Sequence, residues 1–184
     1  MKKYAVFAVL AVVAAACGVF VFCACSKGAD VEKMLEYRTS SSEYEVTLSV
    51  GGYTYGMHLS LGALTGEYPF RDGTAVIAGG SLDGISFDMH NGELRMKTDG
   101  EDGFECALSE KDSPAVYAMF ASFAVEPGDF IGITENDGGT MDARFGGKYK
   151  YTLNLEKETY KPIAISVQTD TDTYKVLFSG AEKQ

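Results

Sequence analysis

The sequence predicts a mainly β protein of the α+β class. A single curved antiparallel sheet, a half-barrel, should wrap around one central helix, with a short N-terminal helix beside it. Runs of alternating apolar and polar residues recur at hairpin spacing from residue 43 onward, roughly ten in all. One nearly apolar segment, residues 114–125, interrupts them and has the length of a helix. A long open sheet with one apolar face must curl to bury that face, so we expect it to enclose this helix.

The first 25 residues have the layout of an export signal. Two lysines follow Met1, and the uncharged stretch YAVFAVLAVVAAACGVFVFCA then leads to Cys25. Ala24 before Cys25 resembles the lipobox of bacterial lipoproteins, in which the cysteine is acylated and becomes the new N-terminus. That resemblance implies a signal peptide over residues 1–25 with Cys25 as the lipidated residue. Cys17, which follows three alanines, is the rival site.

Two alternatives to lipidation remain open for this segment, an uncleaved membrane anchor and an ordinary cleaved signal. An uncleaved anchor is physically reasonable, because a helix of this length can span about 30 Å of hydrocarbon at 1.5 Å per residue. Cys25 is preferred over Cys17, because cleavage at Cys17 would leave the apolar stretch GVFVFCA ahead of the polar segment. Two or more acyl chains such as palmitate on one cysteine would give durable attachment. We therefore expect a membrane-tethered protein on the outer face of the bacterial cytoplasmic membrane, or at the outer membrane in an organism that has one.

The exported part is predicted to be a short tether, residues 26–30, and one domain, residues 31–184, whose length suits a single core. Without the two lysines of the signal, 14 basic residues face 26 acidic ones, a net charge of −12. This acidic balance argues against nucleic acid as a partner.

The elements of this domain follow from local patterns. Residues 31–38 have helical spacing behind Asp30 as a cap. Gly51-Gly52 and Asn91-Gly92 are two-residue hairpin turns. The predicted strands are 43–50, 53–61, 74–79, 84–90, 93–98, 104–108, 148–158, 162–167 and 174–179.

The central helix, residues 114–125, has clear boundaries. Ser113 is its expected cap, Pro114 occupies the first helical position, and Pro127-Gly128 ends it. Alanines fill most of the surface outside one apolar stripe, so the helix should be largely covered. The stripe comprises Val116, Met119, Phe120 and Phe123.

The closing segment YKYTLNLEKETYKPIAISVQTDTDTYKVLFSG resembles the last strands of the lipoprotein-carrier superfamily typified by LolA, LolB and LppX. The positions that carry the likeness are Leu153, Leu155, Thr159, Pro162 and Ile165. Residues 69–100 are similar to small bacterial surface lipoproteins of the same superfamily. The resemblance covers nearly the whole exported part. It implies a half-barrel that holds an acyl chain or another hydrophobic molecule, without a covalent bond, between the sheet and the helix.

Two hypotheses for function follow from the interior. In the first, a lipid or other hydrophobic ligand binds between helix and sheet. In the second, the core is filled, and the protein is a surface adaptor or scaffold whose acidic sheet face docks a protein or cell-envelope partner. The volume of the cavity separates the two. The expected ligand-binding wall is Val116, Met119, Phe120, Phe123, Tyr149, Tyr151 and Leu153.

Enzymatic chemistry is not expected. His58 and His90 fall on the polar sides of their strands, where solvated residues are usual. No spacing of ligand residues typical of zinc or calcium sites occurs, and no glycine-rich phosphate loop joins a strand to a helix. We therefore predict no catalytic residues, no metal site and no cofactor.

Overall fold

The computed structural model describes residues 30–64, 68–98 and 103–179. The chain forms two compact units, Met1–Lys33 and Met34–Gln184. Of the smaller unit only residues 30–33 are described, and they are helical. The predicted signal with Cys25 and Cys17, and all of the tether except Asp30, lie outside the described residues. Across the described ranges, no helix is both long enough and apolar enough to cross a membrane.

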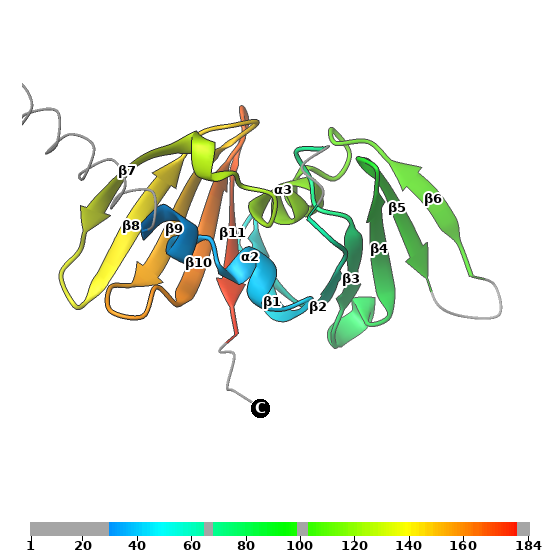
Figure 1. Cartoon of the computed structure of the whole chain (residues 1–184). Helices are drawn as coiled ribbons and strands as arrows, with labels where there is room; N and C mark the ends of the chain where they lie inside the picture. Colours follow the sequence, from blue (N-terminus) through cyan, green and yellow to red (C-terminus); the bar gives the residue numbers. More distant parts are fainter. Residues whose placement is uncertain (1–29, 65–67, 99–102, 180–184) are drawn as a thin grey trace, which may run out of the picture. The chain divides into compact units, whose positions relative to one another are not determined.

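The larger unit is built on one antiparallel sheet of eleven strands, which is open and confirms the predicted architecture (Figure 1). Its order is β6-β5-β4-β3-β2-β1-β11-β10-β9-β8-β7, so β6 and β7 are the edge strands. The strands are β1 (Glu43–Val50), β2 (Tyr53–Leu61), β3 (Gly73–Ile77), β4 (Ile85–His90), β5 (Glu93–Thr98), β6 (Glu105–Leu108), β7 (Phe130–Glu135), β8 (Thr140–Phe145), β9 (Lys150–Glu156), β10 (Pro162–Gln168) and β11 (Thr173–Phe178).

Tight turns set the register of this sheet. Gly51 and Gly52 have φ values of +56° and +86°, which a two-residue hairpin turn requires and glycine adopts without strain. The β1–β2 pairing that follows places Val46 opposite Met57, and both side chains are buried. One face of the sheet is therefore apolar along its length, as the alternation predicted.

Helix α3 (Pro114–Ser122) lies on the concave side of the sheet, between its two arms (Figure 1). Every residue from Ala115 to Ser122 is buried, which confirms that the helix is covered. The predicted end at residue 125 was wrong by three residues. The N–H groups of Phe123 and Ala124 donate to carbonyls only three residues back, so the chain tightens and leaves the helix. This places the Phe123 ring in an aromatic cluster with Tyr37, Tyr44 and Phe178.

The predicted continuous helix over residues 31–38 was also wrong. Helical residues 30–34 are followed by a turn at residues 35–36 and then by α2 (Tyr37–Ser40). The turn lets two adjacent side chains reach the interior. The Tyr37 hydroxyl donates to Ser122 O at 2.6 Å, and the Arg38 guanidinium donates to Leu35 O at 3.2 Å and to Val125 O.

Two short 3₁₀ turns complete the unit, η1 (Gly80–Leu82) between β3 and β4, and η2 (Pro127–Asp129) between α3 and β7. A second buried arginine, Arg71, donates to Gly62 O at 2.9 Å and to Arg38 O. Hydrogen bonds from the two guanidinium groups therefore join α2, the β2–β3 connection and the segment after α3.

Candidate functional site

A cleft of about 910 Å³ lies where α3 begins. Three segments far apart in the sequence form it. Glu110 and Lys111 come from the connection between β6 and α3, and Pro114 is the first residue of α3. Residues 147–150 come from the β8–β9 turn and the start of β9, and residues 168–171 from the end of β10 and the β10–β11 turn. All three segments belong to the larger unit, so the fold of that unit alone positions the cleft.

The connection before α3 presents Glu110 and Lys111 because it closes into a hydrogen-bonded turn. The Ser109 hydroxyl donates to the Asp112 carboxylate at 2.5 Å, and the N–H groups of Asp112 and Ser113 donate to Ser109 O at 3.0 and 3.1 Å. Hydrogen bonds from Ser109 lower the pKa of Asp112, which keeps this acceptor ionised. The turn therefore holds the two residues at its centre in a fixed position at the cleft.

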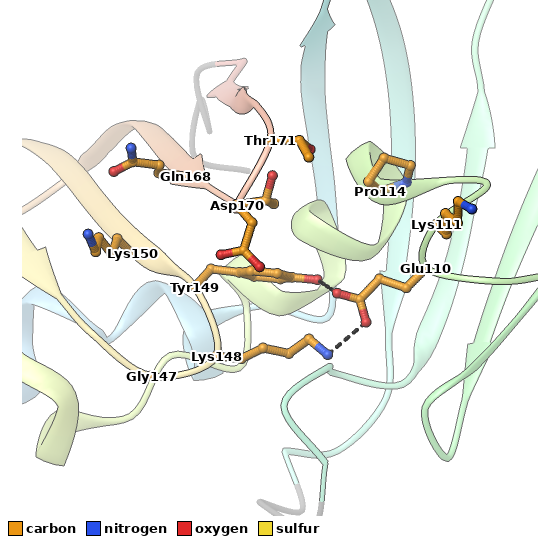
Figure 2. A pocket seen from close by; sticks show the side chains of 11 residues that line it. Glu110, Lys111, Pro114, Gly147, Lys148, Tyr149, Lys150, Gln168, Asp170 and Thr171 are labelled. Atoms are coloured by element: carbon orange, nitrogen blue, oxygen red, sulfur yellow. Dashed lines mark hydrogen bonds and ion pairs between the residues drawn. The ribbon is translucent and has the colours of Figure 1, made fainter.

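Glu110 connects this turn to the opposite side of the cleft, as Figure 2 shows. Its carboxylate accepts a hydrogen bond from Lys148 Nζ at 2.7 Å and one from the Tyr149 hydroxyl. The Lys148 ammonium also lies 4.8 Å from the centre of the Phe70 ring, within the range of cation–π attraction. These contacts join the start of α3 to the β8–β9 turn.

The charges of this cluster follow from its contacts. Burial raises the pKa of Glu110, but hydrogen bonds from Lys148 and Tyr149 outweigh burial and bring the pKa below its usual value. Burial, together with the adjacent Glu110 carboxylate, raises the pKa of Tyr149. Glu110 is therefore an anion and Tyr149 a neutral donor at neutral pH.

Replacing Glu110 with glutamine should change how stability depends on pH. Because the folded-state pKa is lowered, the carboxylate contributes stability above its ordinary pKa of about 4.5, and this is lost as the pH falls through the folded pKa. Urea unfolding should show wild type more stable than the variant at pH 7, with the difference shrinking below about pH 4. Glu158→Gln, at an exposed position, is the control. A difference that persists unchanged in acid would contradict the ion pair.

Lysines give the cleft a positive character in an acidic chain. Lys111, Lys148 and Lys150 line it, with Glu110 and Asp170 as the acids. Lys148 is engaged by Glu110, whereas Lys111 and Lys150 form no ion pair with any described residue. Two ammonium groups are therefore available to an anionic group in the cleft.

The seven residues predicted to bind a ligand are all buried on the concave side. Met119, Phe120 and Phe123 have no exposed surface, so the space between α3 and the sheet is filled at these side chains. The Tyr149 and Tyr151 rings pack edge to face, with centres 6.2 Å apart. Of the seven, only Tyr149 lines the cleft, and Val116, Tyr151 and Leu153 complete the packed interior. A ligand role for these residues stays a prediction.

Sequence reasoning missed the other residues of the cleft. The sequence indicated only that Lys148 and Lys150 lie on the polar side of a strand. It indicated only a polar connection for Glu110 and Lys111. Nothing local to these segments indicates that they meet. Their convergence depends on strand order, which places β9 beside β10 and near the start of α3.

The two histidines lie on the solvated side of the sheet. Both ring nitrogens of His58 are 2.8 Å from carboxylate oxygens, one of Glu45 and one of Glu43, and the hydrogen bond with Glu45 is the main cause of its raised pKa. His90 lies 3.1 Å from Asp72 and is exposed. Within the part of the chain that the structure describes, no group of three or more His, Cys, Asp or Glu side chains is arranged to hold a metal ion.

No protein-family model and no curated protein matches the chain. It is similar to solved structures that include an outer membrane lipoprotein-sorting protein domain from Vibrio parahaemolyticus, with a TM-score of 0.46 and 12% identity over 84% of this chain and 91% of that one. LprF from Mycobacterium bovis has a TM-score of 0.43 and 13% identity over 86% and 95%. A LolA superfamily protein from Nitrosomonas europaea has a TM-score of 0.43 and 10% identity over 82% and 90%.

At 13% identity or less, these likenesses concern the fold alone. All three TM-scores lie below 0.5, so we draw no functional argument from them.

Proposed function

We propose that this protein is a membrane-tethered, extracytoplasmic binding protein without enzymatic activity. Its ligand is an amphiphile, an apolar molecule that carries an anionic group, and it binds in the cleft at the start of α3. The observation that supports this most is the cleft itself, whose volume of about 910 Å³ is that of a small-molecule site and whose rim carries lysines.

The apolar part of the ligand would lie toward the interior. Pro114 and Tyr149 line the cleft, and Tyr149, directly before β9, is buried like Tyr151 and Leu153 of that strand. A chain that enters beside Tyr149 therefore meets apolar side chains on the way to α3. Met119, one of several buried methionines, can adapt its shape, because methionine is unbranched and has three rotatable bonds.

The anionic part would lie at the rim, between Lys111 and Lys150. An ammonium group is a compact charge that binds carboxylate or phosphate by charge-assisted hydrogen bonds. Lys148 does not take part in binding the charged group, because its ammonium is paired with Glu110. This pair joins two walls of the cleft. The proposal therefore assigns affinity for the charged group to two lysines and leaves the third a structural role.

Native mass spectrometry of residues 26–184, purified without detergent, tests this proposal. We expect a co-purifying amphiphile, and we expect its occupancy to fall in the double variant Lys111→Glu/Lys150→Glu. Lys161→Glu/Lys175→Glu, at exposed lysines outside the cleft, is the charge-matched control and should retain the ligand. A protein that repeatedly carries no additional mass would contradict ligand binding.

The tether has its own test. Cells grown with a clickable palmitate analogue should label the wild-type protein and the Cys17→Ala variant, whereas Cys25→Ala should lose the label, because two or more acyl chains on Cys25 are the proposed anchor. Label that is lost in Cys17→Ala and kept in Cys25→Ala would move the anchor to the rival site. Absence of label from the wild-type protein would contradict lipidation and favour an uncleaved membrane anchor or an ordinary cleaved signal.

The filled interior favours a second candidate, a surface adaptor or scaffold that docks a protein or cell-envelope partner. Met119, Phe120 and Phe123 are fully buried, so the helix is held by ordinary core packing at these positions. The adaptor requires no ligand in the cleft. Absence of a bound mass together with normal stability would favour it over the first candidate.

A further inference from the structure

The edge strand β7 offers backbone hydrogen bonds to a further strand. Among the described strands, it pairs with β8 alone. Asn136 N–H donates to Thr140 O at 3.0 Å, and in an antiparallel pair such bonds alternate along the strand. Thr134 therefore directs its N–H and C=O toward β8, whereas Ile133 and Glu135 direct theirs toward the open edge.

The side chains of β7 are unusually exposed for apolar residues in a strand. Ile131 is 64% exposed and Ile133 is 42% exposed. Ile133 lies opposite Ala143, which lies opposite Leu153, and both of these are buried. The apolar side chains of Leu153, Ala143 and Ile133 therefore form one row across the sheet. The row is buried at Leu153 and Ala143 and exposed at its last member, Ile133.

The usual protection of a sheet edge is weak here. Natural edges carry charged residues, especially lysine, or proline, are very short, or are twisted away by a bulge. β7 contains no lysine, arginine or proline, its one charged residue is Glu135 at its end, and its irregularity lies at its beginning, between Phe130 and Gly132. The stretch from Gly132 to Glu135 is regular, so it can accept a neighbouring strand. The opposite edge, β6, has only four residues.

The charge around this edge is mainly negative. Arg144 on β8 lies beside Gly132, but residues 129–137 contain three acidic residues and no lysine or arginine. Asp129 and Asp137 flank β7 and form no ion pair with a described residue. Glu135 pairs with Lys157 at 2.5 Å but remains exposed. The strand is therefore complementary to a basic partner.

We propose that the open edge of β7 docks an extended, basic segment of a partner protein, which adds to the sheet as a further strand. The segment places an apolar residue beside Ile133 and, two residues along, a lysine or arginine beside Glu135. A second copy of this chain fits poorly, because β7 paired with itself in antiparallel fashion brings the Glu135 and Asp137 end of one copy beside Asp129 of the other.

Synthetic peptides test this proposal on the full-length protein. A labelled peptide of alternating lysine and valine should bind, by fluorescence anisotropy, at least about tenfold more tightly than an alternating glutamate–valine peptide. It should also outbind a peptide with the same lysines and valines in two blocks, because only alternation matches the face of a strand. Amide hydrogen exchange should slow at Ile133 and Glu135 and not in β6.

Two variants separate edge pairing from general charge attraction. Ile133→Pro removes an N–H that points to the open edge and leaves the hydrogen bonds to β8 intact, so binding should fall by about tenfold. Ile133→Thr keeps the N–H and should bind better than the proline variant. Glu135→Lys should shift the preference toward the glutamate–valine peptide, whereas Glu105→Lys on β6 should not.

Three results of the binding and exchange experiments would overturn the proposal. They are equal binding of all three peptides, binding that Ile133→Pro and Glu135→Lys leave unchanged, and protection of amides outside β7. Dimerisation of the protein alone through β7, detected by sedimentation and abolished by Ile133→Pro, would assign the edge to a second copy and would likewise contradict the basic partner.

Discussion

Replacing Phe120 with alanine should lower the free energy of unfolding by about 3–5 kcal/mol, because the fully buried ring would leave a cavity between α3 and the sheet. Urea unfolding of wild type and variant measures the difference. Phe104→Ala is the control, since that ring is 56% exposed and its loss should cost about 0.5 kcal/mol or less.

The same variant distinguishes packed core from the wall of a ligand cavity. A loss of stability below about 1 kcal/mol, together with a loss of bound ligand, would mean that Phe120 lines a cavity as the resemblance implied. A large loss of stability with the ligand retained would locate binding in the cleft at the start of α3.

Replacing Arg38 with methionine is expected to cost about 2–3 kcal/mol, because two backbone carbonyls lose a charged donor in a buried setting. Arg38 is buried, and its guanidinium donates to Leu35 O and Val125 O. Thermal and urea unfolding measure the effect. Arg95→Met is the matched control, because Arg95 is exposed and makes a surface ion pair with Glu105, so we expect little change. Equal losses in the two variants would contradict the structural role of Arg38.

Much of the sheet could be predicted from the sequence, because strand and turn signals coincide. The strands at 43–50, 53–61 and 93–98 were predicted to the residue. Gly51-Gly52 separates the first two strands, and Asn91-Gly92 directly precedes the third. Apolar and polar residues alternate along all three. Where a turn fixes φ and the alternation fixes the face, local information is sufficient.

The strands β7 and β8 were not named in advance, and the reason differs between them. β7 has exposed residues on both faces, a glycine at position 132 and a shift of register, so its sequence carries little alternation. In β8, Met141, Ala143 and Phe145 alternate and are all buried. This alternation would have been sufficient to predict β8 as a strand.

The cleft could not be predicted, because its parts are brought together by topology. Lys111 and Lys150 lie in separate segments, and each is unremarkable as an exposed residue in its own context. The predicted apolar stripe was correctly placed in the interior. Burial alone does not distinguish a packed core from a collapsed binding site, and for this reason the ligand role of the stripe requires an experiment.

Titration with cis-parinaric acid, a fluorescent fatty acid, tests the central claim most directly, because the chain has no tryptophan to interfere. Wild type should bind the acid at least about tenfold more tightly than its uncharged methyl ester, and Lys111→Glu/Lys150→Glu should abolish that preference while Lys161→Glu/Lys175→Glu keeps it. Absence of saturable binding, or equal affinity for acid and ester in wild type, would contradict the account.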